Sequence, residues 1–306
     1  MRVTVLTGGV GGAKFVEGLA HCGEDLELTA IVNTGDDFRH LGLHVSPDID
    51  TLLYTLAGLA DRAQGWGRAD ETWNFMTALS ALGGPEWFRL GDADLALHAL
   101  RTERLAQGMP LSAVVDEIAA HWGIPVRVLP MSDEPVATWL DTDEGALAFQ
   151  TYFVARQCRP TVRAVRFEGA ARARPAPGVT EAIGGAGAIL IAPSNPWLSV
   201  DPILAVPGIA DALRAARAPV IAISPLIGGR AVKGPTGKLI AELGLAPDNA
   251  TIAAHYAGLL DGLVHDLADA PPPGLPARAT ATLMTSIDDK RRVALAALAF
   301  ARELAR

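Results

Sequence analysis

Short apolar runs alternate with segments of helical periodicity along this 306-residue chain. The runs are rich in β-branched side chains and are bounded by turn residues, which is typical of strands. They predict strands at residues 3–6, 28–32, 126–129, 188–192 and 220–223. A helical pattern at 13–21 lies between the first two, and such a β-α-β unit implies parallel strands joined by a right-handed crossover.

Four helical patterns then follow one another with no strand between them. They cover residues 49–59, 71–82, 93–106 and 111–122, so we expect a helical insertion over about residues 47–122. An amphipathic pattern at 288–304 predicts a closing helix.

Two apolar runs, 136–140 and 146–154, flank the turn sequence Asp-Thr-Asp-Glu-Gly and predict a β-hairpin. Pro and Arg are dense over 156–177, which indicates an irregular crossing on the surface. We therefore predict one α/β domain over residues 1–306. Its core is a Rossmann-like, doubly wound and mainly parallel sheet, with a helical insertion and a small β-hairpin subdomain at about 130–175.

Composition excludes several classes of protein. Half of the residues are hydrophobic and a fifth are charged, so the chain has ample material for a core. The net charge is −8, which argues against broad nucleic-acid binding. No apolar stretch is long enough for a membrane span, and two cysteines, Cys22 and Cys158, are too few for a disulfide framework or a four-ligand zinc site. We expect a cytoplasmic protein.

The first candidate site is a glycine-rich loop that links the first strand to the first helix. It reads Thr-Gly-Gly-Val-Gly-Gly-Ala-Lys over residues 7–14. Glycines let the backbone approach a ligand closely, and a helix N-terminus offers N–H groups to a phosphate. Lys14 stands where a dinucleotide fingerprint has its third glycine, and the loop is not a Walker A motif. A tight turn is the alternative, but four glycines exceed what a turn needs.

Four carboxylates follow the second strand within fifteen residues: Asp36, Asp37, Asp48 and Asp50. In a doubly wound sheet this segment lies beside the glycine loop, at the edge where ligands bind. A helix start with Ser46 as N-cap and proline at the first position explains the last two acids alone. It does not explain the cluster, because carboxylates repel one another unless a cation or protons intervene. Hard oxygen ligands beside a phosphate favour Mg²⁺.

Three further segments carry candidate polar groups. Asp94, His98 and Arg101 share a helix face, which an exposed ion-paired surface also explains. Pro-Ser-Asn-Pro follows one predicted strand at 193–196, and the segment 224–235, in which Arg230 and Lys233 accompany Gly-Gly, follows another. Each loop alone could be a simple turn, but loops that follow parallel strands gather at one edge of the sheet.

Taken in order, these motifs resemble the 2-phospho-L-lactate transferase family. The resemblance rests on Gly-Gly-Val-Gly-Gly-Ala-Lys-Phe, Val-Asn-Thr-Gly-Asp-Asp, Ser-Pro-Asp-Ile-Asp-Thr, Leu-Gly-Asp-Ala-Asp-Leu-Ala-Leu-His, Met-Ser-Asp-Glu-Pro-Val, Phe-Gln-Thr-Tyr-Phe-Val, Pro-Ser-Asn-Pro and Ser-Pro-Leu-Ile-Gly-Gly, and it runs to about residue 290. It implies Mg²⁺-dependent transfer in the biosynthesis of coenzyme F-420. The donor would be a guanosine diphosphate whose outer phosphate carries a three-carbon acid. The ribityl hydroxyl of the deazaflavin Fo would attack the outer phosphorus and release GMP.

The resemblance also suggests roles for individual side chains. Asp36 and Asp48 would hold the metal, and Asp50 would orient the acceptor hydroxyl. The diphosphate and nucleotide would contact Gly9, Gly11, Gly12, Lys14, Asn33, Ser194 and Asn195. The deazaflavin would lie against Trp87, Arg89, His98 and Asp50, because a planar ring system needs stacking surface.

Two other functions remain open at this point. A related group of the same fold binds nucleotide sugars and regulates metabolism without transfer chemistry. A nicotinamide-dependent oxidoreductase is disfavoured by Lys14 and by the carboxylate cluster. The sequence does not choose between lactyl, enolpyruvyl and glyceryl donors. We expect small-molecule substrates and a homodimer, with no nucleic-acid or membrane partner.

Overall fold

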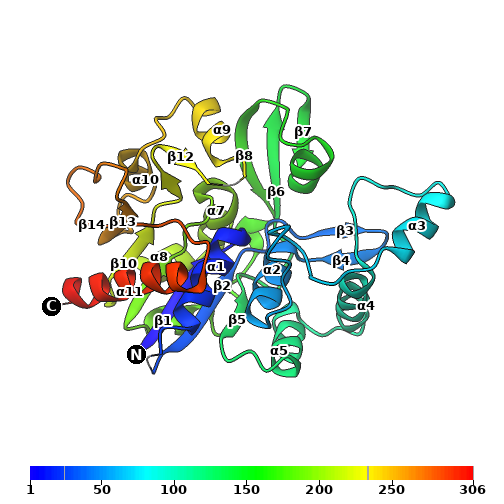
Figure 1. The fold of residues 1–306 in the computed structure, drawn as a ribbon, viewed down its shortest axis with the longest axis horizontal. Coiled ribbons are helices and arrows are strands. Elements are labelled where there is room, and N and C mark those ends of the chain that lie inside the picture. The colour runs from blue at the N-terminus through cyan, green and yellow to red at the C-terminus, as the bar shows by residue number, and fades with distance from the viewer. Residues whose placement is uncertain (24, 233, 306) are drawn as a thin grey trace.

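The computed structural model describes residues 1–23, 25–232 and 234–305, and its centre is a parallel sheet (Figure 1). The strand order is β14-β13-β10-β9-β1-β2-β5, and every neighbouring pair is parallel. The strands are β1 (Arg2–Thr7), β2 (Glu27–Val32), β5 (Arg127–Pro130), β9 (Ala188–Ile191), β10 (Val220–Ile223), β13 (Gly262–Asp266) and β14 (Ala277–Thr280). All five predicted strands are present, and the α/β fold class is confirmed. The last two strands were not predicted.

Helices cover both faces of this sheet. Along β1, Val3 and Val5 face one hydrophobic core and Leu6 faces the other. The first face is covered by α1 (Gly9–Ala20), α2 (Pro47–Leu56), α5 (Leu111–His121) and α11 (Ile287–Leu304). The second is covered by α6 (Val179–Gly184), α7 (Asp201–Leu204), α8 (Ile209–Ala215), α9 (Thr236–Glu242) and α10 (Asn249–His255). In Figure 1 the red α11 lies beside the blue α1.

The segment after β2 begins with a short hairpin that the pattern did not predict. It consists of β3 (Phe38–His40) and β4 (Leu43–Val45), and it extends with α3 (Asn74–Ala81) to one side of the sheet (Figure 1). The helix α4 (Asp92–Ala106) follows α3. Helix α3 is shorter than the predicted 71–82, because Glu71 instead accepts hydrogen bonds from the backbone at the start of α4.

The predicted hairpin region is a three-stranded antiparallel sheet in the order β7-β6-β8. Its strands are β6 (Ala137–Thr142), β7 (Gly145–Ala148) and β8 (Val162–Glu168). Two details of the prediction were wrong. The second strand of the hairpin ends early, and the chain turns into a π-helix, η1 (Thr151–Ala155). The segment expected to be irregular contains β8, because this Arg-rich stretch pairs along β6.

The connectivity places the loops that carry the motifs around one crevice. The chain moves outward from β1 to β2 and β5, and later returns to β9 on the other side of β1. Ligands bind at such a switch point in doubly wound sheets. The remaining elements are a hairpin of β11 (Leu226–Ile227) and β12 (Arg230–Ala231), η2 (Ala170–Arg172) and η3 (Pro196–Val200). Within the described ranges, no helix has the length and apolar character that crossing a bilayer requires.

Candidate active site

The glycine loop after β1 brings three parts of the chain into close contact. A Cβ atom at Gly8 would lie 2.5 Å from the Oδ2 atom of Asp48, and one at Gly12 would lie 2.2 Å from the Oγ1 atom of Thr7. Gly9 has a φ of +67°, a conformation that favours glycine. Part of the glycine content therefore serves packing between neighbouring loops. The N-terminus of α1 has no side-chain cap and lies at the crevice, where it can bind an anion.

The loop after β9 lies against this glycine loop. The hydroxyl of Ser194 donates to the Gly8 carbonyl oxygen at 2.7 Å and accepts from the Gly8 N–H at 3.2 Å. Asn195 caps η3 by accepting from two backbone N–H groups, and its amide nitrogen donates to Thr236. Both side chains thus lie at the predicted edge, where they shape the loop. Lys14 belongs to α1, about one turn after its start, and donates to the Met284 carbonyl oxygen at 3.1 Å.

Two buried carboxylates meet beside the start of α1. The amide of Asn33 donates to Asp48 at 2.9 Å, and one carboxylate oxygen of Asp36 has no hydrogen-bond partner. Burial raises the pKa of Asp36 well above its usual range, and the charge of Asp48 raises it further. Burial also raises the pKa of Asp48 to about 6, although Asn33 and the Gly9 N–H oppose the shift. This pair, which the sequence predicted as metal ligands, is the one here that could hold a divalent cation.

No larger metal-binding group surrounds this pair. In the part of the chain that the structure describes, no three His, Cys, Asp or Glu side chains are placed to hold one ion. Any cation at Asp36 and Asp48 would need its remaining ligands from a bound substrate and water. Mg²⁺ commonly binds in this way, through one or two carboxylates and substrate phosphates.

A second group of carboxylates is bound mainly by side chains of the protein, although one oxygen of Asp37 has no hydrogen-bond partner and burial raises the pKa of Asp37. Asp37 accepts from the Ser46 hydroxyl at 2.8 Å and contacts the His44 ring at 3.1 Å. Ser46 occupies the predicted N-cap position of α2, but its hydroxyl bonds to Asp37 and not to the helix backbone. Both oxygens of Asp50 are bound by the guanidinium of Arg101.

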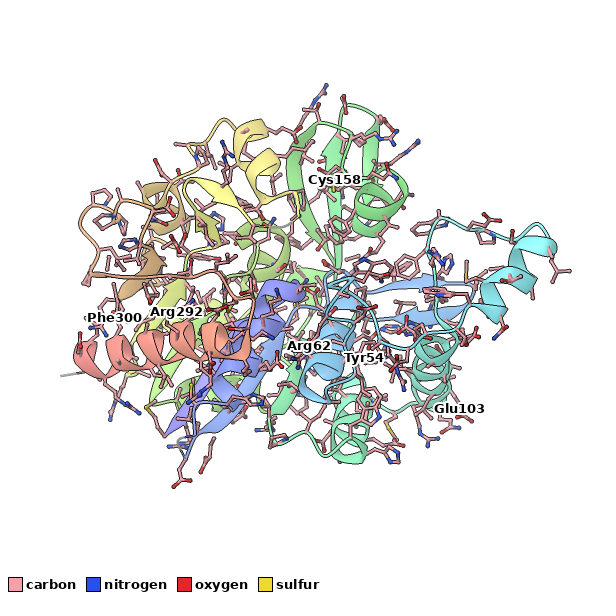
Figure 2. All side chains as sticks on the ribbon, in the orientation of Figure 1. Tyr54, Arg62, Glu103, Cys158, Arg292 and Phe300 are labelled. Atoms are coloured by element: carbon pink, nitrogen blue, oxygen red, sulfur yellow. The ribbon has the colours of Figure 1, made fainter. Side chains whose placement is uncertain are left out.

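The interface between α2 and α4 buries the rest of this second group. The His98 ring lies between Asp50 and Asp94, 3.6 Å from the first and 3.2 Å from the second. Tyr54, which Figure 2 labels on α2, donates to Asp94 at 2.5 Å. The predicted helix face of Asp94, His98 and Arg101 therefore exists, but it is an inner surface. His98 and Asp50 are therefore buried in the α2–α4 interface, and neither side chain has appreciable exposed surface with which to contact an acceptor substrate.

Aromatic side chains gather where the β3–β4 hairpin meets the loop before α4. The Trp87 ring lies 5.2 Å from the His40 ring and 6.1 Å from the Phe38 ring, and Phe88 packs edge-on against Phe38 at 4.8 Å. Trp87 is 38% exposed, whereas the buried Nε2 atom of His40 has no hydrogen-bond partner. This cluster offers planar stacking surface. Sequence reasoning missed Phe38 and His40, although they directly follow the motif Asn-Thr-Gly-Asp-Asp.

Arg89 faces away from this cluster. Its guanidinium stacks over the Trp73 ring at 4.1 Å, and both line a cavity of about 230 Å³. Asp94 and Glu71 line the same cavity. The predicted deazaflavin residues are therefore divided among the aromatic cluster (Trp87), this cavity (Arg89) and the α2–α4 interface (His98).

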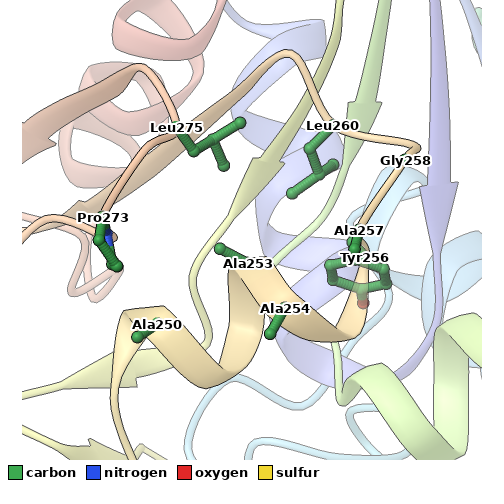
Figure 3. Close-up of a pocket in the computed structure, with 9 residues that line it drawn as sticks. All are labelled: Ala250, Ala253, Ala254, Tyr256, Ala257, Gly258, Leu260, Pro273 and Leu275. Carbon is green, nitrogen blue, oxygen red and sulfur yellow. The ribbon is translucent and has the colours of Figure 1, made fainter.

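A mainly apolar hollow lies elsewhere on the molecule. It measures about 260 Å³, and alanines of α10 line it together with Tyr256, Leu260 and Leu275 (Figure 3). Its walls carry no carboxylate, histidine or lysine, so it lacks the groups that phosphate chemistry needs.

Comparison with known proteins shows the family and the fold of this chain. The family model described as 2-phospho-L-lactate transferase CofD matches residues 3–298. A phosphoenolpyruvate transferase of Streptomyces coelicolor is 45% identical, and the match covers 99% of each chain. One from Mycobacterium sp. is 42% identical over 93% of this chain and 94% of its own. A solved UPF0052-family protein of Bacillus halodurans shares the fold, with a TM-score of 0.64 at 18% identity, covering 97% of this chain and 99% of that one.

Proposed function

This chain belongs to the 2-phospho-L-lactate transferase CofD family, and we propose that it transfers an enolpyruvyl phosphate group to Fo. The family assignment makes it a transferase of coenzyme F-420 biosynthesis. The proposed donor is a guanosine diphosphate whose outer phosphate is esterified to enolpyruvate. Relatives with 40–45% identity are named phosphoenolpyruvate transferases, which favours this acid over lactate.

The observation that carries the proposal is the uncompensated pair Asp36 and Asp48 beside the N-terminus of α1. Their raised pKa values and the unpartnered oxygen of Asp36 are expected of carboxylates that bind a cation. Bound there, Mg²⁺ would neutralise charge on the diphosphate and on the departing phosphate. Asn33 would hold Asp48 in orientation for it.

The chain's own groups would bind and align the two substrates. The N-terminus of α1 and the loop after β9 would hold the diphosphate and the nucleotide. The aromatic cluster of Phe38, His40, Trp87 and Phe88 would stack against the deazaflavin. The ribityl hydroxyl would then form a bond to the outer phosphorus as the bond to GMP breaks, and its proton would be released. Holding both reactants in line lowers the entropic part of the barrier.

The test is product analysis by mass spectrometry. The enzyme is incubated with Mg²⁺, Fo and one donor at a time: the enolpyruvyl, lactyl or glyceryl derivative of guanosine diphosphate. We expect GMP and an Fo enolpyruvyl phosphodiester, formed fastest from the enolpyruvyl donor. Preference for the lactyl donor would overturn the choice of acid. Tight binding of a UDP-sugar without turnover of any donor would overturn the proposed function itself.

We further propose that the protein acts in the cytoplasm as a homodimer. Leu82 at the end of α3 and Leu100 on α4 are exposed, by 86% and 36%, so the helical insertion carries apolar surface that a second copy could cover. Sedimentation equilibrium of the full chain tests the dimer, and a monomer at micromolar concentration would contradict it.

A further inference from the structure

We propose that Arg101 is a positioning residue, which holds Asp36 and Asp48 in place from helix α4 without touching either. This inference rests on the proposed function, because it assigns the metal to those two carboxylates. Arg101 contacts the first turn of α2, which carries Asp48, and His44 of β4, whose ring contacts Asp37, the chain neighbour of Asp36. It would therefore act on the site through Asp50 and His44.

The first contact holds the start of α2. Arg101 has no exposed surface, and its two terminal nitrogens bind the two oxygens of Asp50, one of them at 3.1 Å. A two-pronged pair of this kind fixes orientation as well as distance. Asp48 and Asp50 both belong to the first turn of α2, so holding one carboxylate limits rotation of the turn that presents the other.

The second contact holds the segment next to Asp36. Arg101 donates to the His44 carbonyl oxygen at 3.4 Å, and the hydroxyl of Thr102 accepts from the His44 N–H at 2.7 Å. The His44 ring in turn contacts Asp37 at 3.1 Å, and Asp37 is the chain neighbour of Asp36. Arg101 and Thr102 of α4 thus hold the α2 turn that carries Asp48 and, through His44 and Asp37, the segment next to Asp36.

Packing alone does not account for a buried arginine here. Replacing a buried ion pair by apolar side chains of similar volume is often neutral or stabilising, so Arg101 and Asp50 are a costly way to join two helices. The pair has a second effect at the site. Because Arg101 neutralises Asp50, that carboxylate is not available to a cation at the crevice. The cation would meet only Asp36 and Asp48 as uncompensated carboxylates.

The experiment compares two double variants, each of which removes an arginine of α4 together with its carboxylate partner on a neighbouring helix. Arg101→Met with Asp50→Leu removes the buried pair and leaves no lone charge. Arg104→Met with Glu117→Leu removes an exposed pair one turn further along α4 and serves as the matched control. Arg101→Lys keeps the charge but loses one prong. Mn²⁺ binding is measured by the loss of its free EPR signal, and kcat and KM for Fo are measured with Mg²⁺.

We expect the Arg101→Met/Asp50→Leu variant to fold and to bind Mn²⁺ about 10- to 100-fold more weakly, the usual cost of losing an outer support of a metal ligand. Its kcat should fall with the KM for Fo changed less than about threefold, and Arg101→Lys should lie between it and the parent. The control variant should match the parent in all three measurements. A purely structural role would lower thermal stability and leave Mn²⁺ affinity unchanged in the fraction that folds.

The outcomes separate this inference from the proposed function. If the parent binds Mn²⁺ and makes product while the folded Arg101 variants bind it within twofold, the positioning role is wrong and the proposed function stands. If neither Arg101 variant folds, Arg101 is structural and the inference is rejected. If the parent itself neither binds Mn²⁺ nor modifies Fo, the proposed function fails first.

Discussion

Two pairs of carboxylates lie around the first turn of α2, and their side-chain partners differ. Asp50 and Asp94 are matched by Arg101, His98 and Tyr54. Asn33 is the side-chain hydrogen-bond partner of both Asp36 and Asp48. Their described partners include no cationic side chain. The pKa values of Asp36 and Asp48 are raised, whereas that of Asp94 is lowered.

Burial raises the pKa of Asp36 and Asp48, and for Asp48 it reaches about 6. At Asp94, burial also acts to raise the pKa, but the hydrogen bond and charge of His98 outweigh it and the pKa is lowered. A buried carboxylate with its counter-ion supplied by the fold is part of the scaffold. A buried carboxylate without such a counter-ion is a candidate for a functional site.

The largest effect should come from removing an uncompensated carboxylate. Asp36→Asn and Asp48→Asn should each lower turnover by at least about 100-fold, because a lost metal ligand costs more than a lost outer support. Each variant should unfold at the same or a higher temperature than the parent, since a buried repulsion is relieved. Steady-state kinetics and calorimetry measure both. Full activity in either variant would remove that residue from the metal site.

The pH dependence should distinguish the two pairs next. Asp48 must lose its proton to bind a cation, so below pH 6 the affinity for Mg²⁺ should fall by about tenfold per pH unit. For the metal-free protein, stability should change with pH in the opposite direction. The folded state holds the proton more tightly than the unfolded chain, so the free energy of unfolding should decrease as the pH rises from about 4 to about 6.

Thermal unfolding at pH 5 and pH 7, with and without Mg²⁺, tests both parts. We expect Mg²⁺ to stabilise the protein at pH 7 and to have much less effect at pH 5. Equal stabilisation at the two pH values would show that Asp48 is not a ligand, because its proton would then not compete with the metal.

Substitutions around the compensated pair, Asp50 and Asp94, should change the stability of the protein more than its turnover. Tyr54→Phe removes one hydrogen bond to Asp94 and leaves a buried acceptor short of a donor, which costs about 1–3 kcal/mol of the free energy of unfolding. Urea denaturation measures the loss. The control is Thr55→Val, next along α2, which removes a hydroxyl bonded only within its own helix. A Tyr54→Phe variant as stable as this control would place Asp94 among the uncompensated carboxylates.

Sequence periodicity was sufficient for five strands of the central sheet, but it missed the buried β13, which reads Gly-Leu-Val-His-Asp. β9 and β10 are apolar throughout and were predicted within a residue of their ends. β14 reads Ala-Arg-Ala-Thr and β8 reads Val-Arg-Ala-Val-Arg-Phe-Glu, and neither has an apolar run. Both are edge strands that depend on pairing with β13 and β6, a tertiary effect that local pattern does not contain.

The candidate site also contains parts that the sequence predicts and parts that depend on tertiary packing. Loop order after parallel strands was enough to bring Gly8, Ser194, Asn33 and Asp48 together, because topology alone decides which edge they share. The face of α4 carrying Asp94, His98 and Arg101 was recognised, but its burial was not. Helical spacing shows which side chains share a face and not which element covers it.

The smallest expected effect concerns Arg89, which lies between the two regions. It stacks on Trp73 in the cavity that Asp94 also lines, yet it follows directly after the aromatic cluster. Arg89→Ala should weaken Fo binding about threefold and leave GDP binding unchanged, which is the size of an exposed cation–π contact. Fluorescence titration of Fo and calorimetry with GDP measure the two affinities, and Trp87→Ala gives a reference for loss of the stacking surface. If Arg89→Ala weakens both ligands equally, or only lowers thermal stability, Arg89 belongs with the compensated scaffold, and the deazaflavin surface ends at Trp87 and Phe88.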